Sequence, residues 1–197
     1  MTQVTTAAAG RGRLSAEREA ELYRHVIDLV RELGYDSLTM DAVASRAHVS
    51  KATLYRQWKG KPQLVASAMR HARPLLLDDV DTGSLPGDLH ALAEAGMALE
   101  DDTVFMSAVG HAVHLNPDLG AALREMLVEP VLVVLREMLA RAVARGEIRE
   151  GAAAGEFLGH MLVGALPARK ILEDRFADTE YMKSYINSVV LPALLNS

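Results

Sequence analysis

Apolar residues recur every three or four positions along most of this chain, which is the spacing of an amphipathic α-helix. The first stripe runs from Ala16 to Leu33 and stops at Gly34, a residue suited to the position after a helix. Further helices are expected over 39–48, 51–58, 62–73, 88–101, 103–115, 118–145, 152–173 and 179–195. No segment alternates apolar and polar residues between turn signals, so the sequence predicts an all-α protein.

Prolines and a loop punctuate this pattern. Pro130, Pro167 and Pro192 fall inside periodic stretches, where the missing N–H group should kink or split a helix. Residues 78–87 combine Asp, Gly and Pro, which predicts a loop or linker.

The charge of −5 is distributed unevenly along the 197 residues. Residues 1–75 carry 12 Lys and Arg against 7 Asp and Glu, whereas residues 76–197 carry 9 against 19. The first part is therefore basic (+5) and the second acidic (−10). This asymmetry is typical of a nucleic-acid-binding module joined to a different domain, although chance clustering of surface charge would produce it too.

Several classes of protein are excluded by composition. The chain has no cysteine, which removes disulfides, thiolate metal sites and cysteine nucleophiles. It has no Gly-rich phosphate loop and no metalloprotease or serine-hydrolase motif, so we expect no enzyme activity, no cofactor and no metal. No apolar run is long enough for a membrane span and the N-terminus lacks a signal-peptide core, which predicts a cytoplasmic protein without a membrane partner.

Two short predicted helices form a helix-turn-helix pattern, with Thr39 and Ser50 as their N-caps. Leu54 and Trp58 are four residues apart and must face inward to hold the second helix against Val43 and Ala47. The opposite face and its edges could enter the DNA major groove, and they carry Lys51, Ala52, Thr53, Tyr55 and Arg56.

The runs LGYDSLTMDAVA (33–44) and AHVSKATLYRQWKGK (47–61) resemble the DNA-binding domain of the bacterial TetR family, over roughly residues 15–65. Residues 1–14 are rich in Thr, Ala and Gly, which predicts a flexible arm. The resemblance implies a three-helix helix-turn-helix domain over 15–62 and a larger helical effector-binding and dimerisation domain over 63–197. It places Thr39, Ser50, Thr53, Tyr55 and Lys61 at phosphate-contacting positions and Lys51, Ala52 and Arg56 at or near base edges.

Two positions depart from the family pattern. His48 stands where the family usually has Gly, so the turn is strained or His48 itself contacts the DNA backbone. Trp58 replaces the more usual Phe, a volume change that the core must absorb.

The acidic remainder resembles the C-terminal region of the same family, with 81–85 and 144–149 similar to a common subtype. The resemblance implies a homodimer in which the last two long helices pair with those of a second copy. Its apolar contacts would come from Leu158, Leu162, Ile186, Val190 and Leu194.

An effector pocket in the C-terminal half would use adaptable apolar side chains, together with His111 and with Arg169 as a partner for an anion. Ordinary core packing explains the same residues. The candidate lining comprises Met97, Phe105, Met106, Val109, His111, Met126, Val133, Phe157, Met161 and Arg169.

The leading hypothesis is a transcriptional repressor that a small apolar or aromatic ligand releases from a palindromic operator in double-stranded DNA. Two alternatives remain open: a DNA-binding regulator that senses no ligand, and a helical small-molecule-binding protein with a degenerate DNA module.

Overall fold

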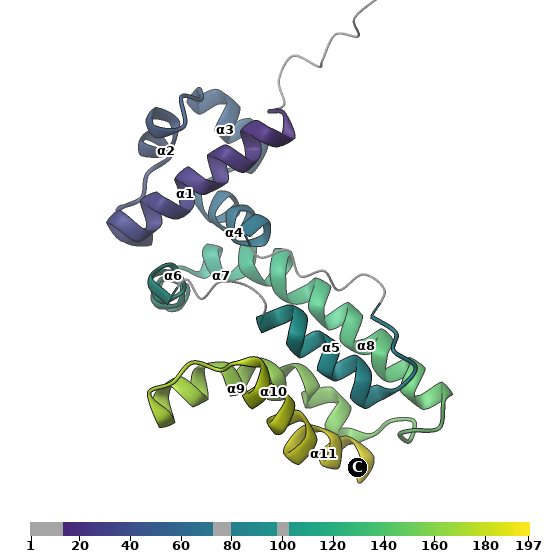
Figure 1. Cartoon of the computed structure of the whole chain (residues 1–197). Coiled ribbons are helices and arrows are strands. Elements are labelled where there is room, and N and C mark those ends of the chain that lie inside the picture. Colours follow the sequence, from purple (N-terminus) through teal and green to yellow (C-terminus); the bar gives the residue numbers. More distant parts are fainter. Residues whose placement is uncertain (1–13, 73–79, 98–102) are drawn as a thin grey trace, which may run out of the picture. The chain divides into compact units, whose positions relative to one another are not determined.

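The computed structural model describes residues 14–72, 80–97 and 103–197, and every regular element in these ranges is helical (Figure 1). This confirms the predicted all-α class. The chain forms two compact units: a first unit of Met1–Pro74 and Asp102–Met126, and a second unit of Leu75–Asp101 and Leu127–Ser197. Within the described ranges, no helix is both long enough and apolar enough to cross a membrane.

The first unit is built on a long N-terminal helix that packs against the fourth and sixth helices, while the seventh packs on the fourth. Its elements are α1 (Ala16–Ser37), α2 (Met40–Arg46), α3 (Lys51–Trp58), α4 (Lys61–Ala72), α6 (Thr103–Leu115) and α7 (Pro117–Leu123). Leu22, Val26 and Val30 of α1 are fully buried, as the predicted apolar stripe requires.

Local signals in the sequence define the ends of these helices. Gly34 has φ = +76° and interrupts α1 at the predicted position. Thr39 Oγ1 accepts a hydrogen bond from Ala42 N–H at the start of α2, and Ser50 Oγ accepts one from Thr53 N–H at the start of α3. Side-chain caps of this kind satisfy N–H groups that have no partner inside the helix.

The sequence predicts a domain boundary after residue 62, but the two compact units divide the chain elsewhere. Helices α4, α6 and α7 belong to the same unit as α1–α3. A polar contact supports this grouping: Asn116 Nδ2, between α6 and α7, donates to Asp36 Oδ1 near the end of α1 at 3.3 Å. The functional division into a DNA-binding domain and an effector domain stays a prediction. Residues 1–13 of the predicted arm lie outside the described residues.

The second unit has its own apolar core, centred on side chains of α5, α8 and the last helices. α5 packs against α8, α10 and the π-helical turn before α11 (Figure 1). Its helices are α5 (Leu85–Met97), α8 (Glu129–Ala144), α9 (Leu158–Glu173), α10 (Thr179–Tyr185) and α11 (Leu191–Leu195), with a 3₁₀ turn over Ala153–Phe157.

Two of the three prolines alter their helices as predicted. π-Helical turns, Arg124–Val128 and Ile186–Val190, end two residues before Pro130 and Pro192. Proline has no N–H group for the carbonyl four residues earlier, and the wider turn accommodates that missing bond. α9 runs unbroken through Pro167, so the expected split does not occur there.

Segments 81–85 and 144–149 meet in one ion-pair network of the second unit. Asp88 is fully buried, and its Oδ1 accepts hydrogen bonds from the N–H and hydroxyl of Thr82 at 2.6 and 2.8 Å. Guanidinium nitrogens of Arg141 and Arg145 lie 3.7 and 3.5 Å from its Oδ2. Glu147 pairs with Arg145 and accepts from the N–H of Leu85.

Burial by itself would raise the pKa of Asp88, because a low-dielectric environment disfavours the charged carboxylate. The hydrogen bonds from Thr82 and the charges of Arg141 and Arg145 outweigh burial, so the pKa lies below its ordinary value. The network thus holds a buried carboxylate in its ionised form.

Candidate nucleic-acid interface

α2 and α3 pack as the sequence predicts. Leu54 and Trp58 of α3 are buried together with Val43 and Ala47. The opposite side of α3 is open: Lys51, Ala52 and Arg56 are exposed, Tyr55 retains 52% of its surface, and Thr53 is half-buried. A short helix with small and polar residues on its open face has the dimensions to enter a major groove.

Trp58 is accommodated by a polar partner as well as by apolar packing. Its Nε1–H donates to Tyr23 Oη at 3.3 Å, and the two rings meet edge to face with centroids 5.8 Å apart. The contact satisfies a buried indole N–H, a group that usually needs an acceptor. It also fixes α3 on α1, and therefore fixes the direction in which the open face points.

Two of the hydroxyl groups predicted to contact phosphate, those of Thr39 and Ser50, are helix caps. Thr39 and Ser50 are exposed, and Ser50 Oγ lies 2.9 Å from Thr53 Oγ1. Cap hydroxyls and the first N–H groups of α3 lie at a helix N-terminus, which favours an anion such as phosphate.

The turn between α2 and α3 has the strain expected from a non-glycine residue. His48 has φ = +52°, a left-handed conformation that most side chains disfavour, and it is exposed. Its side chain is therefore accessible beside the start of α3.

Lys61 has a partner within the chain. Its Nζ donates to the carbonyl oxygens of Tyr35 and Asp36 at 3.0 and 3.3 Å, and it lies 4.3 Å from the centre of the Tyr35 ring. Burial lowers the pKa of Lys61, while the charge of Asp36 acts in the opposite direction. The lysine ties the start of α4 to the end of α1, a role that sequence reasoning missed.

The sequence pattern also did not predict the contact between Lys51 and Asp41. Lys51 Nζ lies 2.6 Å from Asp41 Oδ2, across the turn between the two helices. Residues ten apart in sequence give no periodic signal, and only the angle between α2 and α3 brings them together. α3 itself contains Lys51 and Arg56 but no Asp or Glu.

The predicted effector residues are divided between the two units. Phe105 and Val109 are core residues of the first unit, and Met126 accepts a hydrogen bond from Ser67 there. His111 is exposed, as are Val133 and Phe157 of the second unit, and Met161 is half-buried. The side chains of Met97 and Met106 lie outside the described residues.

Arg169, the predicted partner for an anionic ligand, is paired with two carboxylates of the chain. It is only 6% exposed, its Nη1 lies 3.0 Å from Asp178 Oδ2, and its Nε lies 3.4 Å from Glu173 Oε2. Its guanidinium also stacks on the ring of Tyr181. These contacts join the end of α9 to the start of α10, because Asp178 caps α10.

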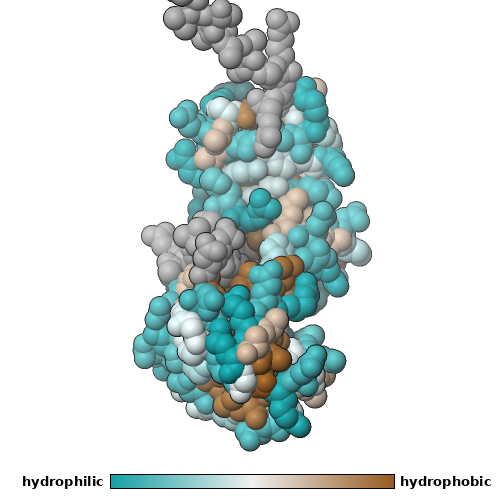
Figure 2. Space-filling view, turned by 90° about the vertical axis from the view of Figure 1, so that its right-hand side faces the viewer, coloured by the Kyte–Doolittle hydropathy of each residue, from teal (hydrophilic) through white to brown (hydrophobic). Residues whose placement is uncertain are grey.

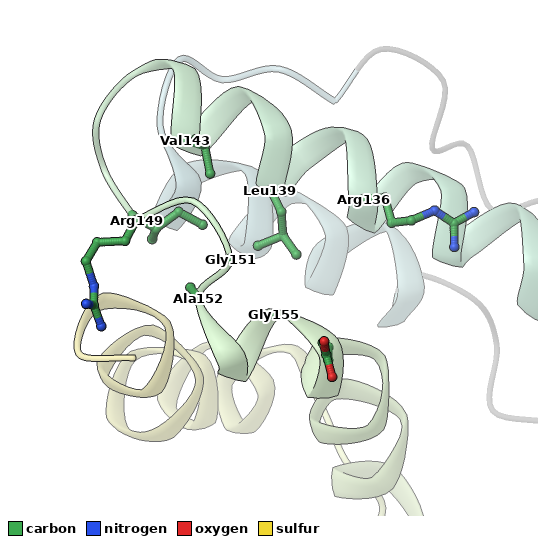
Figure 3. Close-up of a pocket in the computed structure, with 9 residues that line it drawn as sticks. Arg136, Leu139, Val143, Arg149, Gly151, Ala152 and Gly155 are labelled. Carbon is green, nitrogen blue, oxygen red and sulfur yellow. The ribbon is translucent and has the colours of Figure 1, made fainter.

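A cavity of about 320 Å³ lies in the second unit between α8 and the segment that follows it (Figure 3). Leu139 and Val143 point from α8 toward the backbone of Gly151, Ala152 and Gly155. Arg136 and Arg149 stand at opposite ends. Among the predicted effector residues whose side chains the structure describes, none lines this cavity; the remaining lining residues are Ile148 and Glu156.

Most of the predicted dimerisation residues are buried in the second unit, and their place in a dimer interface stays a prediction. Leu158, Ile186, Val190 and Leu194 are fully or almost fully buried there, and Leu162 is half-buried. The sequence pattern identified the apolar side of these helices but not what covers it. The exposed apolar residues of the same region are Phe157, Val163, Ile171, Leu172, Phe176, Val189 and Leu195.

The face opposite the buried side of α9 carries exposed apolar surface. Val163 is 58% exposed and Ile171 81%, and both stand on the side of the helix away from Leu158 and Ala165. Figure 2 shows apolar side chains gathered on the second unit. Contiguous exposed apolar surface is typical of association sites.

A three-helix module with a capped, open recognition helix defines the helix-turn-helix class of DNA-binding proteins. Family models match the chain twice: "Bacterial regulatory proteins, tetR family" over residues 27–68 and "Tetracyclin repressor-like, C-terminal domain" over residues 79–189. The chain belongs to the TetR family of transcriptional regulators, a non-enzymatic class.

Known relatives are similar over most of their length. An uncharacterised HTH-type transcriptional regulator of Mycobacterium tuberculosis is 35% identical over 181 residues, covering 91% of this chain and 89% of the relative. A DNA-binding transcriptional repressor TetR of Mycobacteroides abscessus is 36% identical over 135 residues, covering 66% and 70%. The crystal structure of a TetR family transcription regulator matches with a TM-score of 0.68 and 27% identity, covering 90% and 98%.

Proposed function

We propose that this regulator is a homodimeric repressor that reads a palindromic operator through α3 and is released by a small apolar or aromatic ligand. The open face of α3, held in place by Leu54 and Trp58, is the observation that carries the DNA-binding part. The face bears Lys51, Tyr55 and Arg56, which can meet phosphates and base edges.

Three further observations support the finer parts of the proposal. A relative 36% identical is named a repressor. The cavity beside α8 has a volume at the lower end of small-molecule sites and apolar walls. One eight-residue helix reads few bases, so two copies related by two-fold symmetry are needed for a specific site.

Selection of tightly bound duplexes from a randomised DNA library tests the DNA-binding part. We expect the selected sequences to contain an inverted repeat whose half-sites are centred about 10 base pairs, or a multiple of this, apart. A selected pool without any shared sequence would contradict operator recognition.

Exchange of Ile171 for aspartate is expected to dissociate the dimer. By two-fold symmetry each substitution places a charge at two positions of the same interface, which should raise the dimer dissociation constant roughly a hundredfold or more. Light scattering after size-exclusion chromatography measures the mass. Leu115→Asp is the matched control, since Leu115 is an exposed apolar residue of the first unit. An Ile171→Asp variant that keeps the mass of a dimer would show that this face is not the interface.

A further inference from the structure

The ion pair between Asp41 and Lys51 is placed where it can affect DNA binding. Asp41 is the second residue of α2, and Lys51 is the first residue of α3. The two charged atoms are 2.6 Å apart, although the side chains remain 65% and 58% exposed. The carboxylate therefore stands at the same edge of the helix-turn-helix as the first residue of the recognition helix.

Stability alone is a weak reason for this contact. An exposed ion pair contributes little to the free energy of unfolding, and an acidic residue in the first turn of a helix contributes about as little. Against DNA, a carboxylate at this edge is unfavourable, because phosphates repel it. Its effect on the availability of the neighbouring lysine is the more important one.

We propose that Asp41 is a specificity-determining residue that withholds Lys51 from the phosphates of non-operator DNA. The inference rests on the proposed DNA-binding function. Non-specific affinity comes from cations that replace the counterions of phosphates, and a lysine already paired with a carboxylate contributes little to that exchange.

When the ion pair breaks, operator DNA can replace the lost contact with hydrogen bonds to bases, whereas DNA of arbitrary sequence cannot. A guanine offers Lys51 two acceptors, O6 and N7, in place of the carboxylate. Asp41, once released, can accept from the amino group of a cytosine. The ion pair thus lowers the affinity for DNA of arbitrary sequence. It lowers the affinity for the operator less, because bases of the operator replace the contact.

Exchange of Asp41 for asparagine tests the proposal on a fluorescent mixed-sequence duplex of about 30 base pairs. Fluorescence anisotropy is measured in NaCl between about 0.05 and 0.3 M. The released lysine should make the slope of log K against log salt steeper by about 0.9 for each subunit bound, and should raise affinity about eightfold per subunit at 0.1 M.

A double-mutant cycle shows whether the gain in DNA affinity depends on Lys51. Asp41→Asn is combined with Lys51→Gln, and we expect the gain to vanish in the Lys51→Gln background. Asp28→Asn is the control for net charge: it breaks another accessible ion pair, with Arg31 at 2.8 Å, and alters the charge equally. Thermal melting followed by the fluorescence of Trp58, the single tryptophan, verifies that each variant is folded.

An unchanged slope in Asp41→Asn would overturn the proposal, and so would an equal gain in Asp28→Asn or in the Lys51→Gln background. Each of these results leaves the DNA-binding function intact, because the wild type still binds. A wild type without salt-dependent binding to any duplex would instead contradict the proposed function itself.

Discussion

Exchange of Asp88 for asparagine is expected to lower the free energy of unfolding of the second unit by about 2–3 kcal/mol. The side chain is fully buried, and its carboxylate faces the guanidinium groups of Arg141 and Arg145. An amide of the same shape can still accept from Thr82 but leaves the two cations without their buried counterion. Both cations retain some access to water and a second carboxylate partner, Asp81, so the cost is smaller than for an ion pair that is entirely buried.

Urea unfolding followed by circular dichroism measures this loss, while Trp58 fluorescence reports on the first unit alone. Asp174→Asn is the matched control: Asp174 pairs with Lys170 but is 92% exposed, so its exchange should cost at most about 1 kcal/mol. An Asp88→Asn variant as stable as this control would show that the network is not holding the second unit together.

The difference in the free energy of unfolding between wild type and Asp88→Asn should also depend on pH. The folded-state pKa of Asp88 lies below its ordinary value of 3.8, so its contribution to stability is present above that pH. The contribution is lost as pH falls through the depressed pKa. The difference in the free energy of unfolding between wild type and Asp88→Asn should therefore become smaller below about pH 3.8.

Exchange of Arg56 for alanine is expected to weaken binding to the selected operator by about 10–100-fold for each half-site, which is about 1–3 kcal/mol. Binding to mixed-sequence DNA should change much less, because a base contact carries sequence information. Tyr55→Ala should weaken binding to both duplexes by a similar factor, since its predicted partner is a phosphate.

Fluorescence anisotropy with the two duplexes separates these outcomes. Arg24→Ala removes the same charge from an exposed position on α1 and is the matched control. If Arg24→Ala weakened operator binding as much as Arg56→Ala, the effect would belong to net charge and not to the open face of α3.

Helix ends and the recognition helix could be predicted because their signals are local. Thr39, Ser50 and Gly34 act within four residues of themselves through caps or backbone conformation. The spacing of Leu54 and Trp58 similarly determines which side of α3 is buried.

Contacts across the fold could not be predicted in this way. Asp88 meets Arg145 over 57 positions, and Arg169 is neutralised by Asp178 from the next helix. Periodicity identifies the apolar side of a helix but cannot say whether its own subunit or a second copy covers it. The family resemblance places Leu158, Ile186, Val190 and Leu194 at the dimer interface, and the structure shows them buried within the second unit.

Operator-specific binding is tested most directly by the ratio of two dissociation constants of the wild-type protein. The Kd for the mixed-sequence duplex is divided by the Kd for the selected duplex, both measured at about 0.15 M salt. We predict a ratio of about 10³ or more, as specific regulators show. A ratio close to one would contradict operator recognition by α3.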